Sequence, residues 1–199
     1  MAPPRIVPLQ GLPPVPWKNG GGQSRELLVW PESEGWRLRI SVADIRRDGP
    51  FSSFSGVTRW FAVVAGQGVV LRFSDEERRL FVGSDPLRFD GSWSPACRLV
   101  DGPTSDLNLM ICGGRGTMAT VRPGKSWADP FTHRGLFTRV AGRLVPESGE
   151  PTALPANSLL WQCEANPGAW RFEPDPGVPE NATVAWWLGY SPEENRVSS

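Results

Sequence analysis

The sequence predicts an all-β protein built from two fused double-stranded β-helix (jelly-roll) barrels. Short apolar stretches with period-2 alternation recur along the 199 residues, and turn-forming residues, 22 glycines and 21 prolines, are spread between them. No segment of helix length carries an apolar stripe with a 3.6-residue period. Many short strands separated by regular turns are typical of a jelly roll.

Two segments carry the clearest strand pattern. In residues 36–43 every second residue is apolar, which predicts a strand with one buried face. Residues 106–112 show the same alternation, so Asp106, Asn108 and Met110 are expected to share one face. If that face lines a barrel, these side chains belong to a pocket; if it faces water, they are ordinary surface residues.

A weak internal repeat divides the predicted fold into two halves. Residues 59–65 and 69–73 are expected to pair as a hairpin around a glycine-containing turn, and a similar succession of strands and turns follows Gly142. No long polar linker separates the two copies. We therefore expect a single compact unit over residues 1–199, with approximate halves 1–115 and 116–190 and a polar tail at 191–199.

Charge and composition exclude several classes of partner. With 21 basic and 21 acidic residues, the chain has no net attraction for nucleic acid or an anionic membrane. It contains no apolar run of about 18 residues and no hydrophobic signal core at its start, so a cytoplasmic location is expected. Cys97, Cys112 and Cys163 are widely spaced and are expected as buried thiols rather than disulfides or zinc ligands. Homodimerisation stays open.

The segment 15–26 is the first candidate for ligand binding. Three successive glycines from Gly20 allow a close approach of the backbone to a ligand, and Lys18, Asn19 and Arg25 add donors around them. The spacing matches neither a P-loop nor a dinucleotide-binding fingerprint. The segment is therefore either an anion-binding loop or a flexible turn that leads into a strand.

Arg59 is the second candidate, because it lies where a turn-rich loop enters an apolar strand. With its stem in a barrel and its guanidinium facing a pocket, it would bind a carboxylate through two hydrogen bonds. The alternative is an exposed arginine at a strand end. Arg39, Ser41, Asp106 and Asn108 lie on strand faces that could converge with it.

These segments together resemble the HutD/Ves family. The residues that carry the resemblance are Trp17 to Gly22, Arg25-Glu26, Arg39 to Ala43, Asp48 to Ser52, Phe54, Gly56, Arg59, Asp101-Gly102-Pro103 and Asp106 to Met110. The resemblance is specific over residues 15–110. It implies a bicupin without the histidine cluster that holds the metal in other cupins. The single histidine, His133, agrees with this, and it is expected in an exposed connecting stretch.

The resemblance implies a metal-free, cofactor-free binding protein for a small acidic metabolite such as N-formylglutamate, with a modulating role in histidine utilisation or stress response. The alternative is a cofactor-independent hydrolase or isomerase that uses a carboxylate such as Asp106 as acid or base. No catalytic residue is assigned. The candidate ligand-binding residues are Arg59, Lys18, Asn19, Arg25, Arg39, Ser41, Asp106 and Asn108.

Overall fold

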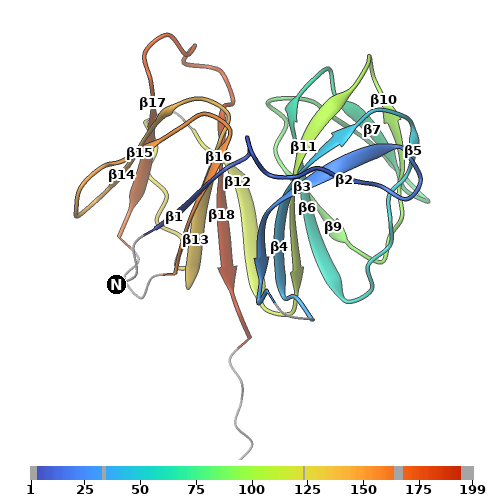
Figure 1. Ribbon diagram of the computed structural model, residues 1–199, viewed down its shortest axis with the longest axis horizontal. Helices are drawn as coiled ribbons and strands as arrows, with labels where there is room; N and C mark the ends of the chain where they lie inside the picture. The colour runs from blue at the N-terminus through green and yellow to red at the C-terminus, as the bar shows by residue number, and fades with distance from the viewer. Residues whose placement is uncertain (1–3, 33–34, 123, 164–167, 194–199) are drawn as a thin grey trace, which may run out of the picture.

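The computed structural model describes residues 4–32, 35–122, 124–163 and 168–193. Within these ranges the chain forms strands and turns without a helix, and so no helix there is long and apolar enough to cross a membrane. Four antiparallel sheets group into two barrels that lie side by side (Figure 1).

The first barrel is formed by a six-stranded and a four-stranded sheet. The six-stranded sheet has the order β2 (Val15–Pro16), β3 (Gly22–Trp30), β4 (Leu38–Ile45), β11 (Thr104–Cys112), β6 (Val57–Ala65) and β9 (Leu87–Asp90). The four-stranded sheet has the order β5 (Gly49–Pro50), β10 (Ala96–Leu99), β7 (Val69–Arg72) and β8 (Glu77–Leu80). Buried side chains such as Phe61, Leu71 and Cys97 form the apolar core of this barrel.

The second barrel is formed by a five-stranded and a three-stranded sheet. The five-stranded sheet has the order β1 (Arg5–Pro8), β16 (Ser158–Cys163), β13 (His133–Thr138), β18 (Ala185–Ser191) and β12 (Arg115–Thr120). The three-stranded sheet has the order β15 (Thr152–Leu154), β14 (Gly142–Pro146) and β17 (Trp170–Pro174). Its core is rich in aromatic rings, among them Trp127, Trp170 and Trp187.

A third apolar cluster joins the two barrels. It combines residues of the six-stranded sheet, such as Ile40 and Leu109, with residues of the five-stranded sheet, such as Trp186 and Leu188. Strand β4 therefore buries both of its faces: the side of Ile40 contacts the second barrel, and the side of Ser41 lines the first. Burial of such large apolar areas is the main contribution to the stability of this arrangement.

Two features of the connectivity differ from the sequence-based expectation. Strand β1 pairs with β16, so the N-terminal strand belongs to the sheet of the second half although it precedes residue 115 (Figure 1). The predicted hairpin of residues 59–73 is wrong, because β6 pairs with β9 and β11 whereas β7 pairs with β8 and β10. Gly66 and Gly68, both with positive φ, turn the chain from one sheet to the other and leave no room for a Cβ atom.

Candidate functional site

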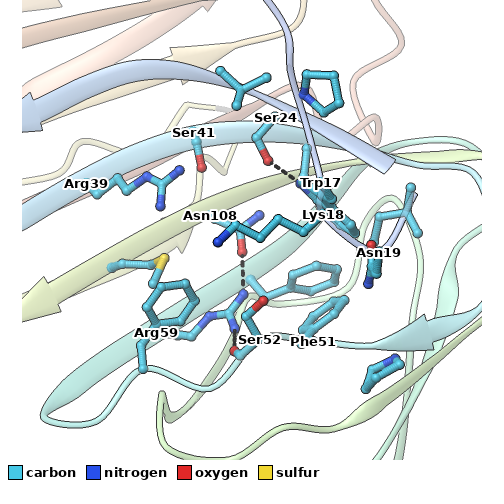
Figure 2. Close-up of a pocket in the computed structure, with 18 residues that line it drawn as sticks. Trp17, Lys18, Asn19, Ser24, Arg39, Ser41, Phe51, Ser52, Arg59 and Asn108 are labelled. Carbon is cyan, nitrogen blue, oxygen red and sulfur yellow. Dashed lines mark hydrogen bonds between the residues drawn. The ribbon is translucent and has the colours of Figure 1, made fainter. Parts of the chain in front are cut away.

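A cavity of about 510 Å³ opens in the first barrel (Figure 2). It contains three cationic side chains and, among the residues that line it, no carboxylate, histidine or cysteine. The lining residues are Val15, Pro16, Trp17, Lys18, Asn19, Ser24, Arg39, Ser41, Ala43, Ile45, Pro50, Phe51, Ser52, Phe54, Arg59, Phe61, Asn108 and Met110. Six of the eight candidates from the sequence therefore share one cavity.

Strand register explains why these residues meet. Strand β11 lies between β4 and β6, and Met110 is directly opposite both Arg39 and Arg59. One step along, Asn108 is directly opposite both Ser41 and Phe61. Directly opposed residues of an antiparallel sheet project from the same face, so two neighbouring rows of side chains point into the barrel.

Arg59 is the buried cation of this cavity. Its side chain donates hydrogen bonds to the Ser52 carbonyl oxygen and to Asn108 Oδ1, both at 3.2 Å. Its guanidinium carbon lies 5.2 Å and 5.7 Å from the ring centres of Phe51 and Phe54. Burial, with a contribution from the positive charge of Arg39, lowers the pKa of Arg59 to about 10, so the side chain stays protonated at neutral pH.

The aromatic environment of Arg59 is the part of the site that sequence reasoning missed. A third ring, that of Phe89 on β9, lies 5.1 Å from the guanidinium carbon. Cation–π contacts compensate part of the cost of burying a guanidinium that lacks an acidic partner among the described residues. The sequence signal was the pair Phe51 and Phe54 in the loop before Arg59; the contribution of Phe89 depends on the pairing of β6 with β9.

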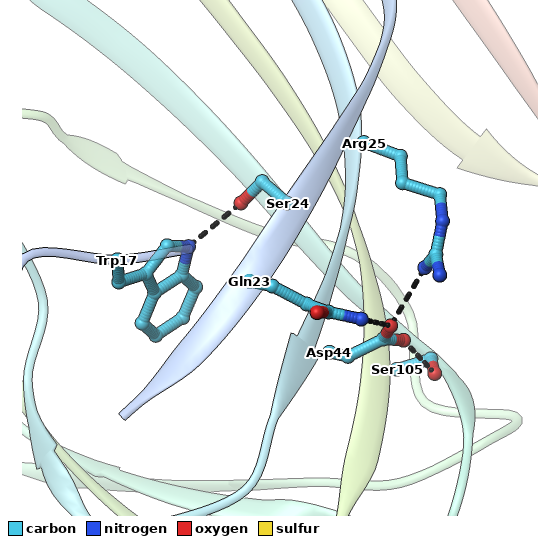
Figure 3. Close-up of polar contacts among 6 residues, drawn as sticks. All are labelled: Trp17, Gln23, Ser24, Arg25, Asp44 and Ser105. Carbon is cyan, nitrogen blue, oxygen red and sulfur yellow. Dashed lines mark hydrogen bonds and ion pairs between the residues drawn. The ribbon is translucent and has the colours of Figure 1, made fainter. Parts of the chain in front are cut away.

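The loop that carries Lys18 and Asn19 is held by local contacts. The Trp17 indole Nε1 donates a 2.8 Å hydrogen bond to Ser24 Oγ (Figures 2 and 3). Asn19 Oδ1 accepts a 3.0 Å bond from the Gly21 amide. A Cβ atom at Gly22 would collide with the Asp44 carbonyl oxygen and press on the Trp17 ring. The segment is thus an ordered part of the wall, and Lys18 points from it into the cavity (Figure 2).

Arg25 is not part of the cavity. It lies opposite Val42, on the face of the sheet that contacts the second barrel, and its Nη1 lies 2.7 Å from Asp44 Oδ2 (Figure 3). Gln23 and Ser105 also donate hydrogen bonds to the Asp44 carboxylate. Burial alone would raise the pKa of Asp44, but these three donors outweigh it and lower the pKa below its ordinary value.

Asp106 is also outside the cavity lining, although it shares the inward face of β11 with Asn108. It is fully buried between Ala43 and Val63, and the nearby Thr104 hydroxyl group lies outside good hydrogen-bond geometry with its carboxylate oxygens. Burial, and then the negative charge of Asp44, raise its pKa well above the ordinary value, and Thr104 lowers it only in part. Burial thus favours the neutral form of this carboxyl group, and because Asp106 is absent from the cavity lining it does not reach a ligand as an acid or base.

The histidine and the cysteines lie away from the cavity. His133 is not in an exposed connecting stretch: it begins β13 at the seam between the barrels, half-buried, with its ring stacked on Trp161 at 6.2 Å. Cys97 is buried, but Cys112 and Cys163 are exposed, contrary to the expectation of three buried thiols. Within the described part of the chain, no group of three or more histidine, cysteine, aspartate or glutamate side chains has a geometry that could hold a metal ion.

Comparison with protein families and curated sequences connects this architecture with known proteins. The sequence profile of the HutD family matches residues 10–168. An uncharacterised 21.2-kDa protein from the hutC 3′ region of Pseudomonas putida is 34% identical over 113 residues, 56% of this chain and 60% of the relative. Protein Ves of Citrobacter koseri is 31% identical over 121 residues, 60% of this chain and 63% of the relative. The match thus spans somewhat less than two thirds of these relatives.

Solved structures agree over a greater length. A conserved protein of unknown function from Pseudomonas aeruginosa superposes with a TM-score of 0.82 at 25% identity, over 96% of this chain and 100% of that one. HutD from Pseudomonas fluorescens superposes with a TM-score of 0.78 at 23% identity, over 95% of this chain and 98% of that one. A mutant of oxalate decarboxylase from Bacillus subtilis superposes with a TM-score of 0.62 at 9% identity, over 95% of this chain and 78% of that one. The cupin fold of these neighbours confirms the predicted two-barrel architecture.

Proposed function

Because the chain belongs to the HutD family, which is linked to histidine utilisation, we propose that it is a metal-free protein that binds a small acidic metabolite and so modulates this utilisation or a stress response. The observation that carries the proposal is the composition of the cavity. Its lining holds Lys18, Arg39 and Arg59, with no carboxylate among the lining residues. Such a cavity attracts anions and disfavours cations.

Arg59 is the residue to which we assign the carboxylate of the ligand. Its guanidinium is buried, fixed by Asn108 and the Ser52 carbonyl group, and surrounded by aromatic rings. A carboxylate in contact with a preorganised guanidinium in a partly dry site forms strong, directional hydrogen bonds. Lysine would keep the charge but not the two-pronged geometry.

N-formylglutamate is the candidate metabolite that we favour. Its two carboxylates suit the cationic lining, and its formamide group can exchange hydrogen bonds with Ser41 and the Asn108 amide, which both line the cavity. A volume of about 510 Å³ is in the range of small-molecule sites. The cofactor-independent enzyme alternative lacks support, because the buried Asp106 is outside the lining.

Calorimetric titration of the purified chain with N-formylglutamate, glutamate and glutamine tests the proposal. We expect binding of N-formylglutamate without turnover, weaker binding to Arg59→Lys, and a further loss in Arg59→Ala, by about 2–5 kcal/mol for a buried charge partner. Elemental analysis should find no stoichiometric transition metal. Equal affinity in all three proteins would remove Arg59 from the site, and conversion of N-formylglutamate during the titration would favour an enzyme.

A further inference from the structure

Two guanidinium groups approach the cavity from either side of Met110. Because Arg39 and Arg59 are both directly opposite Met110 in the sheet, their Cα atoms are two strand spacings apart, roughly 10 Å. In each of them Nε is buried and has no hydrogen-bond partner among the described residues. Buried donors without acceptors are rare in folded proteins, and they point to a group that the cavity receives.

Glu26 engages only one end of one of these arginines. Its Oε1 lies 2.7 Å from Arg39 Nη2, and the two side chains are 43% and 25% exposed. An ion pair that water reaches to this extent contributes little to stability and exchanges partners easily. Arg39 therefore lines the cavity while a weakly held carboxylate neutralises its charge.

We propose that one carboxylate of the ligand bridges Arg39 and Arg59 above Met110, and that Glu26 is an internal competitor that holds Arg39 while the cavity is empty. This inference rests on the proposed function for the class of ligand, but it adds a second arm and a competing residue to the site. The bridging carboxylate supplies acceptors to the two guanidinium groups that line the cavity. It also separates two like charges whose mutual repulsion disfavours the empty site.

Acetate is the probe for this clamp, because it carries one carboxylate and nothing else. In 1H–15N spectra that include arginine side chains, titration with acetate should shift the Nε–H signals of Arg39 and Arg59 together, with one dissociation constant. Arg39→Met should weaken acetate binding about tenfold, the equivalent of one lost charge-assisted contact. Arg39→Lys keeps the positive charge, so its affinity for acetate should lie between that of the unaltered chain and that of Arg39→Met.

Glu26→Gln gives the decisive comparison. Release of Arg39 should strengthen acetate binding about two- to fivefold in the unaltered background and leave it unchanged in the Arg39→Met background. The matched control is Glu76→Gln, which removes the same charge from a similarly exposed ion pair with Arg78, outside the cavity lining.

Three outcomes would overturn these assignments. If Glu26→Gln strengthened acetate binding equally in the unaltered and Arg39→Met backgrounds, Glu26 would act through the long-range effect of its negative charge and not by holding Arg39. Unchanged affinity in Arg39→Met, with binding abolished in Arg59→Ala, would overturn the clamp and leave the proposed function in place. Failure of the unaltered chain to bind either acetate or N-formylglutamate would overturn the proposed function itself.

Discussion

Arg59 of the first barrel and Arg134 of the second lie near the start of equivalent strands, but their guanidinium groups have different partners. The strand order β4–β11–β6–β9 corresponds to β12–β18–β13–β16, which makes β6 equivalent to β13. Both arginines point into the interior of their barrel. Arg59 lines an open cavity, whereas Arg134 is fully buried and donates hydrogen bonds to the Trp127 and Gly168 carbonyl oxygens at 2.9 Å and 2.7 Å.

Aromatic side chains close the second barrel around Arg134. Its guanidinium carbon lies 4.7 Å and 4.2 Å from the ring centres of Trp127 and Trp170. At the position on β18 that corresponds to Met110 on β11, the chain has Gly189, and a Cβ atom there would collide with the Phe131 ring. Phe131 thus fills space beside this strand, so the arginine of the second barrel is a structural element.

The first prediction contrasts these two arginines. Arg134→Met should lower the free energy of unfolding by about 2–6 kcal/mol, because one buried and one partly buried carbonyl group lose their donor and each such loss costs about 1–3 kcal/mol. Arg59→Met should abolish carboxylate binding with a smaller loss of stability, since removal of this charge also relieves its desolvation and its repulsion by Arg39. Urea denaturation of both variants measures the difference, and equal losses would contradict it.

The second prediction concerns the glycine turn of the cavity wall. Gly22→Ala should lower the melting temperature and weaken ligand binding, because its Cβ atom would meet the Asp44 carbonyl oxygen and the Trp17 ring; overpacking of this kind costs about 1–3 kcal/mol. Gly21→Ala is the matched control, since its Cβ atom would meet only the end of the Asn19 side chain, at 3.2 Å. A Gly22→Ala chain that melts and binds like the unaltered one would make the turn a passive linker.

Sequence alternation predicted much of the cavity because it fixes the face of a strand. The shared face of Asp106, Asn108 and Met110, and the shared face of Arg39 and Ser41, follow from period 2 alone, but the pattern does not say that these faces line a barrel. The depth of a residue along the barrel does not follow from this pattern. Asn108 lines the cavity, whereas Asp106, two residues away on the same face, is fully buried outside the lining. The alternation of side chains along β3 also explains why Arg25 is outside the cavity. It follows the cavity residue Ser24 and therefore points to the opposite face of the sheet.

Long-range pairing could not be predicted from local pattern. Two apolar runs around a glycine turn look alike whether they pair with each other or continue into different sheets. The close approach of Gly66 to the Pro103 carbonyl oxygen and to Thr104, which sends β6 and β7 into different sheets, depends on contacts distant in sequence. The placement of β1 beside β16 likewise reflects a partner about 150 residues away.

The third prediction is the pH dependence of Asp106. Its folded pKa is above its unfolded value of 3.8, so between these two values the folded chain binds more protons than the unfolded chain, and stability falls as pH rises. Asp106→Asn, which needs no proton, should therefore be more stable than the unaltered chain at pH 7, and the difference should shrink toward zero as pH falls to about 4. Denaturant titrations across pH 4–8 measure this difference.

Asp44 is the matched control, because its pKa is shifted in the opposite direction and its effect on stability should have the opposite pH dependence. Its folded pKa is lowered, so its ionised form stabilises the fold above the unfolded pKa, and this contribution is lost as pH falls through the folded value. Asp44→Asn should therefore destabilise the chain at neutral pH, where Asp106→Asn stabilises it. An Asp106→Asn chain less stable than the unaltered one at pH 7 would show that the carboxyl group makes a favourable interaction there.

The fourth prediction is that the two barrels unfold as one unit. Their large sheets share an apolar cluster, and β1 adds a further connection by pairing with β16. Urea unfolding should give coincident transitions by tryptophan fluorescence and far-ultraviolet circular dichroism, because exposure of Leu109 or Ile40 on one side of the cluster exposes Trp186 and Leu188 on the other.

Truncation tests the same coupling from its two sides. A chain that ends at Arg122 keeps the six-stranded sheet but loses the sheet that covers it, so it should be sensitive to proteases and lack native fluorescence. Deletion of residues 1–8 removes β1 and uncovers the β16 edge, and it should lower the single transition midpoint without splitting the curve. Two separate transitions, or a folded monomeric chain that ends at Arg122, would show that each barrel is stable on its own and that the shared cluster is a contact between independent domains.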